Sequence, residues 1–382
     1  MERRTELDTL RGLFLIVMTI THLPTHFSQY SSHLFGFVSA AEGFVFLSAF
    51  LIGKIYMRKM NRSGVESVRE SLMQRARQLY SWHLGLILFA FTIATLLALM
   101  GGRPALHNML EFYIQKPVSA LLGAPLLLYQ PPLLDILPMY VVFIALTPGI
   151  LAFALRRGWT QLLALSALLW LFAQFDGRLL MLQAVNWLTH LDIAPNALGA
   201  FDWFAWQALW IAALWAGART SSEHQPLRVP RAAVIAGFIG AAGFFAWYHD
   251  LGGFWPKGEG TPLFDKTKLG ALRLADFTTL AIVATYALLP FLRWLKPQAV
   301  TMLGQASLHV FAAHLLLCMV ALALIGRDQK PLNHWQELLV LVVTFGAMFW
   351  VAWRQKQLKR RAREQGQAAA PKLHIAVTES PK

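Results

Sequence analysis

The chain has 382 residues, of which 56% are hydrophobic and 14% are charged, and its formal net charge is +14 at pH 7. A soluble domain carries about a quarter charged residues, so this composition excludes an ordinary soluble protein and predicts an all-α polytopic membrane protein. The sequence contains one cysteine, Cys318, which excludes an intramolecular disulfide.

Ten segments are predicted to cross the membrane as helices. They are residues 10–27, 37–56, 79–101, 133–155, 160–176, 198–217, 231–249, 269–292, 299–325 and 335–353. Several are shorter than the ~20 residues that cross a bilayer upright, and the fifth is the weakest of them. The first lacks a small-residue cleavage site, so it is predicted to be a retained span and not a signal peptide.

The distribution of lysine and arginine predicts the orientation of these spans. With the N-terminus inside, most of the 34 lysines and arginines fall in segments on the cytoplasmic side. This positive-inside bias predicts that both termini are cytoplasmic. It also accounts for the net charge without a nucleic-acid partner.

Two regions follow from the same pattern. Residues 1–353 are predicted to form one integral-membrane domain. Residues 354–382 are basic and then of low complexity, which predicts a disordered cytoplasmic tail near anionic headgroups. The sequence has no HExxH motif and no cysteine pair, so no metal site is predicted, and it has no phosphate-binding glycine loop.

The first span carries two ionisable side chains on one face. Arg11 and His22 are separated by about three helical turns, so both lie on one stripe roughly 16 Å apart along the helix axis. Such groups are costly in a membrane and often mark a functional site. The spacing predicts a cation at the cytoplasmic entrance and, near the outer end, an imidazole that is either a general base or a structural hydrogen-bonding group. His26 lies one turn further on the same stripe, beyond Pro24.

Two acidic residues are expected at a similar depth. Glu42 lies near the outer start of the second span and is predicted to orient His22 through its Nδ1–H, or else to form a structural pair. Asp135 and Tyr140 lie at the outer start of the fourth span. Asp135 is predicted to be either a catalytic or acceptor-binding carboxylate or the N-cap of that helix.

The eighth and ninth spans also contain polar residues. His309 and His314 in the ninth span are further candidates for the acceptor site. Arg273 and Asp276 in the eighth span are three residues apart and are predicted to neutralise each other in a structural role.

A group of arginines is predicted near the cytoplasmic surface. It consists of Arg4, Arg11, Arg58, Arg75 and Arg77. Guanidinium groups bind phosphates in bidentate geometry, which fits a phosphorylated donor. The other interpretation is topological charge against lipid headgroups, and Arg11 differs from the rest because it shares a face with His22.

The motif Arg4-x3-Asp8-Thr-Leu-Arg11-Gly, with Arg11-x10-His22, resembles the integral-membrane acyltransferase superfamily that O-acylates sugars. The stretches ELDTLRGLFLIVMTITHLPT, FVSAAEGFVFLSAFLIGKIY, DILPMYVVF and LGQASLHVFAAHLLL are similar to its OpgC branch, which succinylates osmoregulated periplasmic glucans. The similarity extends over about residues 4–325. One departure is Ser48-Ala49-Phe50, where such proteins usually have Ser-Gly-Phe.

The resemblance implies a multi-pass protein of the bacterial inner membrane with its acceptor site facing the periplasm. It implies an acyl-CoA donor such as succinyl-CoA as co-substrate, a glucan acceptor and no permanently bound cofactor. The residues expected to act are His22, Glu42 and Asp135 in catalysis, Arg11, Arg4, Arg58, Arg75 and Arg77 in donor binding, and Tyr140, His26, His309 and His314 in acceptor binding.

Other functions remain compatible with the sequence. Ionisable residues in spans also mark the path of a transporter for a glucan or an organic anion, although no inverted pair of broken helices is visible. A non-catalytic partner of a glucan synthase is a further alternative. Within acyl transfer, the residues distinguish neither direct attack from an acyl-histidine intermediate nor one acyl group from another. The oligomeric state is not predicted.

Overall fold

The computed structural model describes residues 4–100, 103–221, 229–253, 260–325 and 332–369. Over these residues every regular element is a helix, as the sequence predicts. The elements in chain order are α1 (Thr5–His22), α2 (Phe27–Ser31), α3 (Ala40–Phe89), η1 (Ala90–Ala94), α4 (Thr95–Leu99), α5 (Pro104–Gln115), α6 (Pro117–Gly123), α7 (Ile136–Arg157), α8 (Trp159–Gln174), α9 (Gly177–Thr189), η2 (Pro195–Leu198), α10 (Trp203–Arg219), α11 (Arg231–Tyr248), η3 (Pro262–Phe264), α12 (Ala271–Val283), η4 (Ala284–Leu288), α13 (Leu289–Leu295), α14 (Gln298–Gln305), α15 (Ser307–Ile325) and α16 (His334–Ala369).

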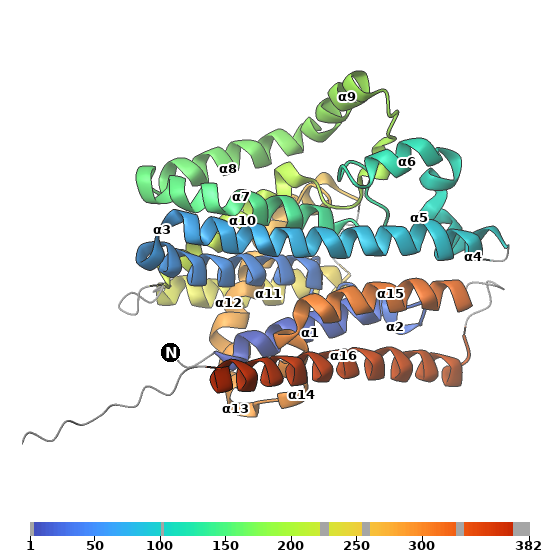
Figure 1. The fold of residues 1–382 in the computed structure, drawn as a ribbon. Coiled ribbons are helices and arrows are strands. Elements are labelled where there is room, and N and C mark those ends of the chain that lie inside the picture. The colour runs from blue at the N-terminus through green and yellow to red at the C-terminus, as the bar shows by residue number, and fades with distance from the viewer. Residues whose placement is uncertain (1–3, 101–102, 222–228, 254–259, 326–331, 370–382) are drawn as a thin grey trace, which may run out of the picture.

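The long helices run roughly parallel or antiparallel to one another in a single bundle (Figure 1). Helix α3 packs on α1, α7 and α10, and α1 also packs on α14 and α15. The first helix begins and the last described helix ends at the same end of the bundle (Figure 1). His22, at the opposite end of α1, therefore lies toward the far end of the bundle, which is called the outer end below.

Seven helices in the described residues are long and apolar enough to cross a membrane, or eight if α8 and α9, bent by 79°, form one span. The predicted ten spans are therefore not confirmed. Two physical reasons account for most of the difference. Helix α1 carries Glu6, Asp8 and Arg11 within its 18 residues, and these three charges make it too polar to be included among the apolar membrane-crossing helices. Residues Ala40–Leu99 are counted once, although the sequence predicts two spans there.

Helix α3 contains a sharp break at Gly64. The backbone there has φ 78° and ψ 174°, in the left-handed region that favours glycine. A Cβ at this position would meet nothing within 4 Å, so the backbone conformation, and not packing, requires the glycine. The two halves of α3 run in opposite directions from this point (Figure 1), which corresponds to the predicted separate spans 37–56 and 79–101.

Glycines bring α1 and α14 into direct backbone contact. A Cβ on Gly12 of α1 would lie 2.1 Å from the carbonyl oxygen of Val300. A Cβ on Gly304 would lie 1.7 Å from the carbonyl oxygen of Asp8. Small residues allow such close packing in membranes, where dispersion contacts replace the hydrophobic driving force. Helix α1 is therefore held closely against its neighbour.

The same arrangement joins α3 to α10. A Cβ on Gly53 would lie 2.3 Å from the carbonyl oxygen of Leu214, and one on Gly217 would lie 2.0 Å from that of Phe50. Each helix thus supplies a glycine at the point where the other helix approaches. These contacts fix the helices that carry the candidate site residues.

The C-terminal segment differs from the expectation. Helix α16 continues to Ala369, so residues 354–369 are helical and not disordered. An i,i+4 ion pair between Arg360 and Glu364 (2.8 Å) supports this helical extension. Charge content alone predicted disorder, but the apolar first half of α16 provides a helix that the basic residues continue. Residues 370–382 lie outside the described part of the chain.

Candidate active site

The outer end of α1 places two histidines in contact. The Nδ1 of His22 lies 3.3 Å from the Nε2 of His314 in α15, and the two ring planes are nearly parallel, with an angle of 15° between them and centroids 5.6 Å apart. His314 is fully buried, and its own Nδ1 lies 2.7 Å from the carbonyl oxygen of Phe311. The sequence marked the two histidines separately, and the fold brings them together as one pair.

The neighbours of His314 determine which nitrogen of each ring carries a proton. A carbonyl oxygen only accepts, so the contact with Phe311 requires a proton on the Nδ1 of His314. In the neutral ring the Nε2 is then an acceptor, and the Nδ1–H of His22 donates to it. The Nε2 of His22 is left unprotonated, which is the form that a general base requires.

Local sequence explains why His22 ends its helix. Leu23 caps α1 in an extended conformation, and Pro24 follows and cannot continue an α-helix. The imidazole therefore stands at the point where the chain leaves the bundle. His314 lies within α15, where neighbouring turns bury it.

His26 is not brought to the histidine pair. Its backbone N–H donates to the Oε1 of Glu337 (2.7 Å), and its ring Nδ1 lies 2.5 Å from the same oxygen. The Glu337 side chain is only 4% exposed, so this contact attaches the end of α1 to the start of α16. Sequence reasoning missed Glu337, although its position at the outer start of an apolar segment marked it as a carboxylate in need of a partner.

Glu42 does not orient His22, contrary to the prediction. Its Oε1 lies 2.5 Å from the Nε of Arg273, and both side chains are almost completely buried. Its Oε2 accepts from the hydroxyl and backbone N–H of Ser39, which completes a capping box at the start of α3. Glu42 is thus a structural ion-pair partner, the alternative that the sequence left open.

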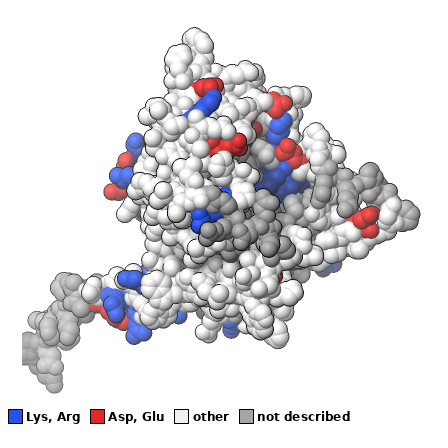
Figure 2. Space-filling model, turned by 90° about the vertical axis from the view of Figure 1, so that its right-hand side faces the viewer, with Lys and Arg blue, Asp and Glu red and all other residues white. Residues whose placement is uncertain are grey.

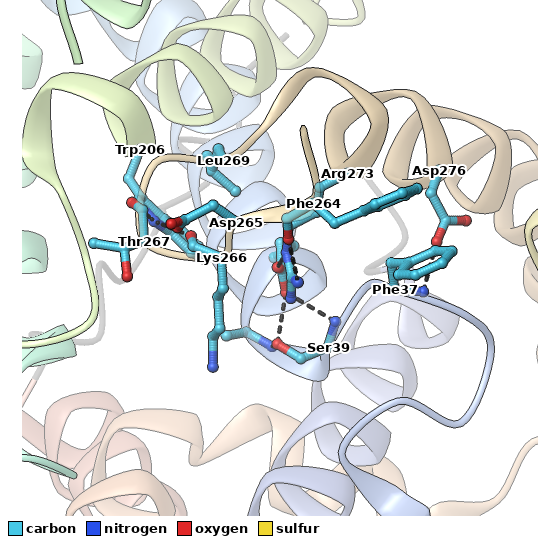
Figure 3. A network of polar contacts seen from close by, with 12 residues as sticks. Phe37, Ser39, Trp206, Phe264, Asp265, Lys266, Thr267, Leu269, Arg273 and Asp276 are labelled. Carbon is cyan, nitrogen blue, oxygen red and sulfur yellow. Dashed lines mark hydrogen bonds and ion pairs between the residues drawn. The ribbon is translucent and has the colours of Figure 1, made fainter. Parts of the chain in front are cut away.

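Arg273 and Asp276 do not neutralise each other. Arg273 pairs with Glu42, whereas the Oδ2 of Asp276 accepts the backbone N–H of Phe37 at 2.9 Å (Figure 3). Helix α12 therefore holds the entry into α3 at two points. His33, in the same entry segment, has a pKa lowered mainly by burial and then by the positive charge of Arg273.

Asp135 is buried and stabilises a turn. Its Oδ2 accepts the backbone N–H of Ala200 at 2.8 Å, beside Gly199, whose φ of +75° places it in the left-handed region. Asp135 occupies the N-cap position of α7, as one of the two interpretations predicted, but its side chain makes no capping hydrogen bond there. Burial raises the pKa of this carboxyl, and the bond from Ala200 and the charge of Lys266 offset part of that shift.

Tyr140 lies within α7, and its side chain is buried in the bundle. Its hydroxyl donates to the carbonyl oxygen of Phe44 at 3.2 Å, and its ring packs edge-on against Trp210. The side chain is buried among α3, α7 and α10. The charges of Arg11 and Arg75 act on it from the side of the bundle where α1 begins.

Of the five predicted donor-binding arginines, Arg11 and Arg75 are partly buried, and the charges of both act on Tyr140. The guanidinium carbon of Arg11 lies 5.8 Å from the centre of the Phe44 ring, within range of a cation–π contact. Arginines from α1 and α3 thus converge on one region, about three turns below His22.

The other three arginines are placed differently. Arg58 donates from its Nε and Nη2 to the carbonyl oxygen of Ser221, beyond the end of α10. Arg77 and Arg4 are exposed, and Arg4 lies near Lys54. Their positions fit the other interpretation, in which surface arginines meet lipid headgroups.

His309 lies away from the histidine pair. It precedes His314 by five residues in α15, which corresponds to roughly 7.5 Å along the helix. Its ring packs edge-on against Trp82 at 5.8 Å, and the charge of Lys359 acts on it. The structure therefore separates the two histidines that the sequence placed together.

Lys266 is a basic residue near the pair that the sequence did not mark. Its positive charge acts on His22, Glu42 and Asp135. Figure 3 shows its side chain extending toward the level of Ser39, away from its own backbone carbonyl, which the indole of Trp206 binds. The sequence feature that could have indicated it is the lysine-rich connection that precedes α12.

The backbone around Lys266 is held by side chains from two helices. The indole N–H of Trp206 donates to the carbonyl oxygens of Lys266 (3.2 Å) and Thr267 (3.1 Å). The indole N–H of Trp170 donates to the carbonyl of Leu269 at 2.9 Å. A buried indole N–H needs an acceptor, so α8 and α10 bind this segment tightly.

The described residues contain no group of three or more His, Cys, Asp or Glu side chains that could hold a metal ion.

A sequence profile of the OpgC protein family matches residues 3–360, which is nearly the whole chain. No curated protein and no solved structure matches it. Family membership and the apolar helices agree with one another. The chain belongs to the OpgC family, and it is a membrane acyltransferase of the kind that modifies glucans.

Proposed function

We propose that the protein transfers a succinyl group from succinyl-CoA to a hydroxyl of a glucan, with His22 as the general base. The observation that carries this proposal is the His22–His314 contact, because its hydrogen-bond pattern leaves the Nε2 of His22 unprotonated. The donor is bound from the cytoplasm and the acceptor from the periplasm of a bacterial inner membrane.

The proposed roles follow the length of α1. Arg11 and Arg75 bind the phosphates of the donor deep in the bundle, where their charges converge on Tyr140. Their partial burial strengthens binding of an anion, because water screens the charges less there. The distance of roughly 16 Å from Arg11 to His22 is of the order of a pantetheine arm, so the thioester reaches the outer end.

The chemical step is a direct acyl transfer. The Nε2 of His22 removes the proton of the sugar hydroxyl as that oxygen attacks the thioester carbonyl, and a carbon–oxygen bond forms. The tetrahedral intermediate collapses, the carbon–sulfur bond breaks, and the His22 imidazolium returns the proton to the departing sulfur. The products are a glucan ester and free CoA thiol.

His314 positions the base in this scheme. Its Nε2 accepts the Nδ1–H of His22 and polarises the ring as it becomes an imidazolium. A neutral imidazole is a weaker partner than the carboxylate of a hydrolase triad, which suits a buried position where an unpaired carboxylate would be costly. Glu42 and Asp135 hold the surrounding chain and do not touch the reacting atoms in this proposal.

The experiment that tests this function is mass spectrometry of periplasmic glucans from a deletion strain complemented with the parental protein or with His22→Ala. Succinyl mass increments with the parent and none with a stably expressed His22→Ala support both the activity and the base. Equal increments in both strains would assign the base elsewhere. No increment in either strain would favour a transporter of a glucan or an organic anion.

A further inference from the structure

We infer that Lys266 binds the free carboxylate of the transferred acyl group and thereby selects a dicarboxylic acyl donor. This inference rests on the proposed function, since it names the substrate class that the same site accepts. The residue lies just before α12 and belongs to neither the histidine pair nor the arginines deeper in the bundle.

The first observation is that the Lys266 ammonium has no anionic partner. In the part of the chain that the structure describes, it makes no hydrogen bond and no ion pair, and no dashed line reaches it in Figure 3. Its contact is with the Phe201 ring, whose centre lies 5.8 Å away. An ammonium group that is only partly exposed is stabilised when a carboxylate supplies hydrogen-bond acceptors.

The second observation is that the neighbouring carboxylates already have other donors. Glu42 is bound by Arg273 and Ser39, Asp135 by the backbone of Ala200, and Asp276 by the backbone of Phe37. Asp265, the adjacent residue, accepts the backbone N–H of Lys268. None of them forms an ion pair with Lys266, so its ammonium remains available to an anion from outside the chain.

The third observation is where the charge acts. Lys266 acts electrostatically on His22, the proposed base, as well as on Asp135 and Glu42. Figure 2, which faces the outer end of the bundle, shows a few basic and acidic side chains close together near the centre of a mostly uncharged face. An acyl group that reaches His22 therefore enters the field of this lysine, whereas the phosphates of the donor remain deep in the bundle near Arg11.

The chemistry of a succinyl group fits this arrangement. Its carboxylate is separated from the reacting carbonyl by two methylene groups, so a cation beside the base can bind one end while the other end reacts. The lysine is preorganised, because the indoles of Trp206 and Trp170 fix the backbone at Lys266 and in the three residues that follow it. A neutral acyl group of the same length would leave the ammonium unpaired, which disfavours its binding.

The test measures donor selectivity with the purified full-length protein in lipid vesicles. Succinyl-CoA and butanoyl-CoA are compared, because butanoyl has a methyl group where succinyl has the carboxylate. Glucose oligomers serve as acceptor, and the readouts are released CoA thiol and ester mass. For Lys266→Met we expect kcat/KM with succinyl-CoA to fall on the order of 10- to 100-fold, mainly through KM, while butanoyl transfer is kept or increased.

Two further variants keep the result interpretable. Lys266→Arg retains the charge, so it should preserve the preference for succinyl-CoA and show that the site tolerates substitution. Lys268→Met is the matched control, because Lys268 lies two residues away and is paired with Asp176 at 2.7 Å. It should leave the ratio of the two donors unchanged.

Each outcome is decisive. Equal losses with both donors in Lys266→Met, together with an active Lys266→Arg, would overturn the inference and assign the lysine to the reacting centre or to the acceptor. An unchanged donor ratio in Lys266→Met would also overturn it. If the parental protein transfers neither acyl group, the proposed function itself is contradicted. This result is distinguishable from a failure of the Lys266 inference, because it is seen with the unsubstituted protein.

Discussion

The Nδ1 of His22 and the Nε2 of His314 lie 3.3 Å apart although 292 residues separate them in the chain. The contact joins the first helix of the bundle to α15, and the carbonyl of Phe311 fixes the proton on the far side of the second ring. The proposed base therefore depends on a buried partner that itself touches no substrate.

His22→Ala should lower kcat on the order of 10²- to 10⁴-fold, the usual contribution of a general base. His314→Ala should cause a smaller loss, and the double variant should be no worse than His22→Ala, because His314 acts through His22. Initial rates of CoA release measure all three. His309→Ala is the control on the same helix and should be close to the parent; additive losses in the double variant would contradict the dependence.

Arg11→Ala and Arg75→Ala should each raise KM for succinyl-CoA on the order of 10- to 100-fold, because each removes a charged donor to phosphate. Arg77→Ala should leave KM unchanged, since this arginine is exposed and its charge is not among those that act on Tyr140. Succinyl-pantetheine, which lacks the nucleotide, gives a second measurement. If KM for succinyl-pantetheine rises as much in Arg11→Ala as KM for succinyl-CoA does, Arg11 is not the phosphate ligand.

Glu42→Gln should destabilise the protein by about 3–5 kcal/mol, because it leaves the Arg273 guanidinium buried without its anion. Thermal unfolding in detergent, followed by tryptophan fluorescence, measures the loss. The double variant Glu42→Gln with Arg273→Met should recover part of it. A variant as stable as the parent but without activity would instead place Glu42 in the chemical step.

Gly12→Ala and Gly304→Ala should each destabilise the contact between α1 and α14, because the added methyl overlaps a backbone carbonyl of the partner helix. Overpacking of this kind costs about 1–3 kcal/mol. Gly149→Ala is the matched control: it is also helical, but a Cβ there meets nothing within 4 Å. It should be neutral or slightly stabilising, and an equal loss at all three sites would contradict the packing explanation.

The burial of Asp135 predicts the direction in which the stability of the protein changes with pH. Burial raises the pKa of this carboxyl in the folded protein above its unfolded value, so the folded state binds the proton more strongly. Stability is therefore lost as pH rises through the folded-state pKa. Asp135→Asn keeps an acceptor for the Ala200 N–H without the charge, so its stability relative to the parent should increase from about pH 4 to about pH 7.

Unfolding temperatures at the two pH values test the Asp135 prediction, with the exposed Asp250→Asn as control. A difference between Asp135→Asn and the parent that does not change with pH would show that the carboxyl stays ionised over this range. If Asp135→Asn folds stably but loses acyl transfer, the carboxylate takes part in the reaction and not only in the turn at Gly199.

The all-helical fold and the features of α1 follow from sequence because they depend on local pattern. Apolar run length predicts helices in a bilayer, and a spacing of three turns places Arg11 and His22 on one face. Helix counts are less predictable, since a single glycine such as Gly64 decides whether the chain reverses and three charges in α1 make a span too polar to be counted.

The partners of the polar residues are not predictable in the same way. Glu42 could pair with any cation at the outer end, and only the packing of α12 against the entry to α3 selects Arg273 over His22. Lys266 was overlooked because a lysine in a connection is ordinarily a solvated charge. Its position depends on indoles that are distant in sequence, Trp206 and Trp170.

The close contact of α1 with α14 has a consequence for the proposed donor. Because Arg11 and His22 lie on one helix, with no side chains between its backbone and that of α14 at Gly12, their separation stays constant when other helices shift. Helix α1 therefore sets a fixed distance between the two residues. A carrier whose charged head lies nearer to its thioester than this fixed length cannot satisfy both residues at once, so the enzyme would discriminate among carriers by the length of the arm.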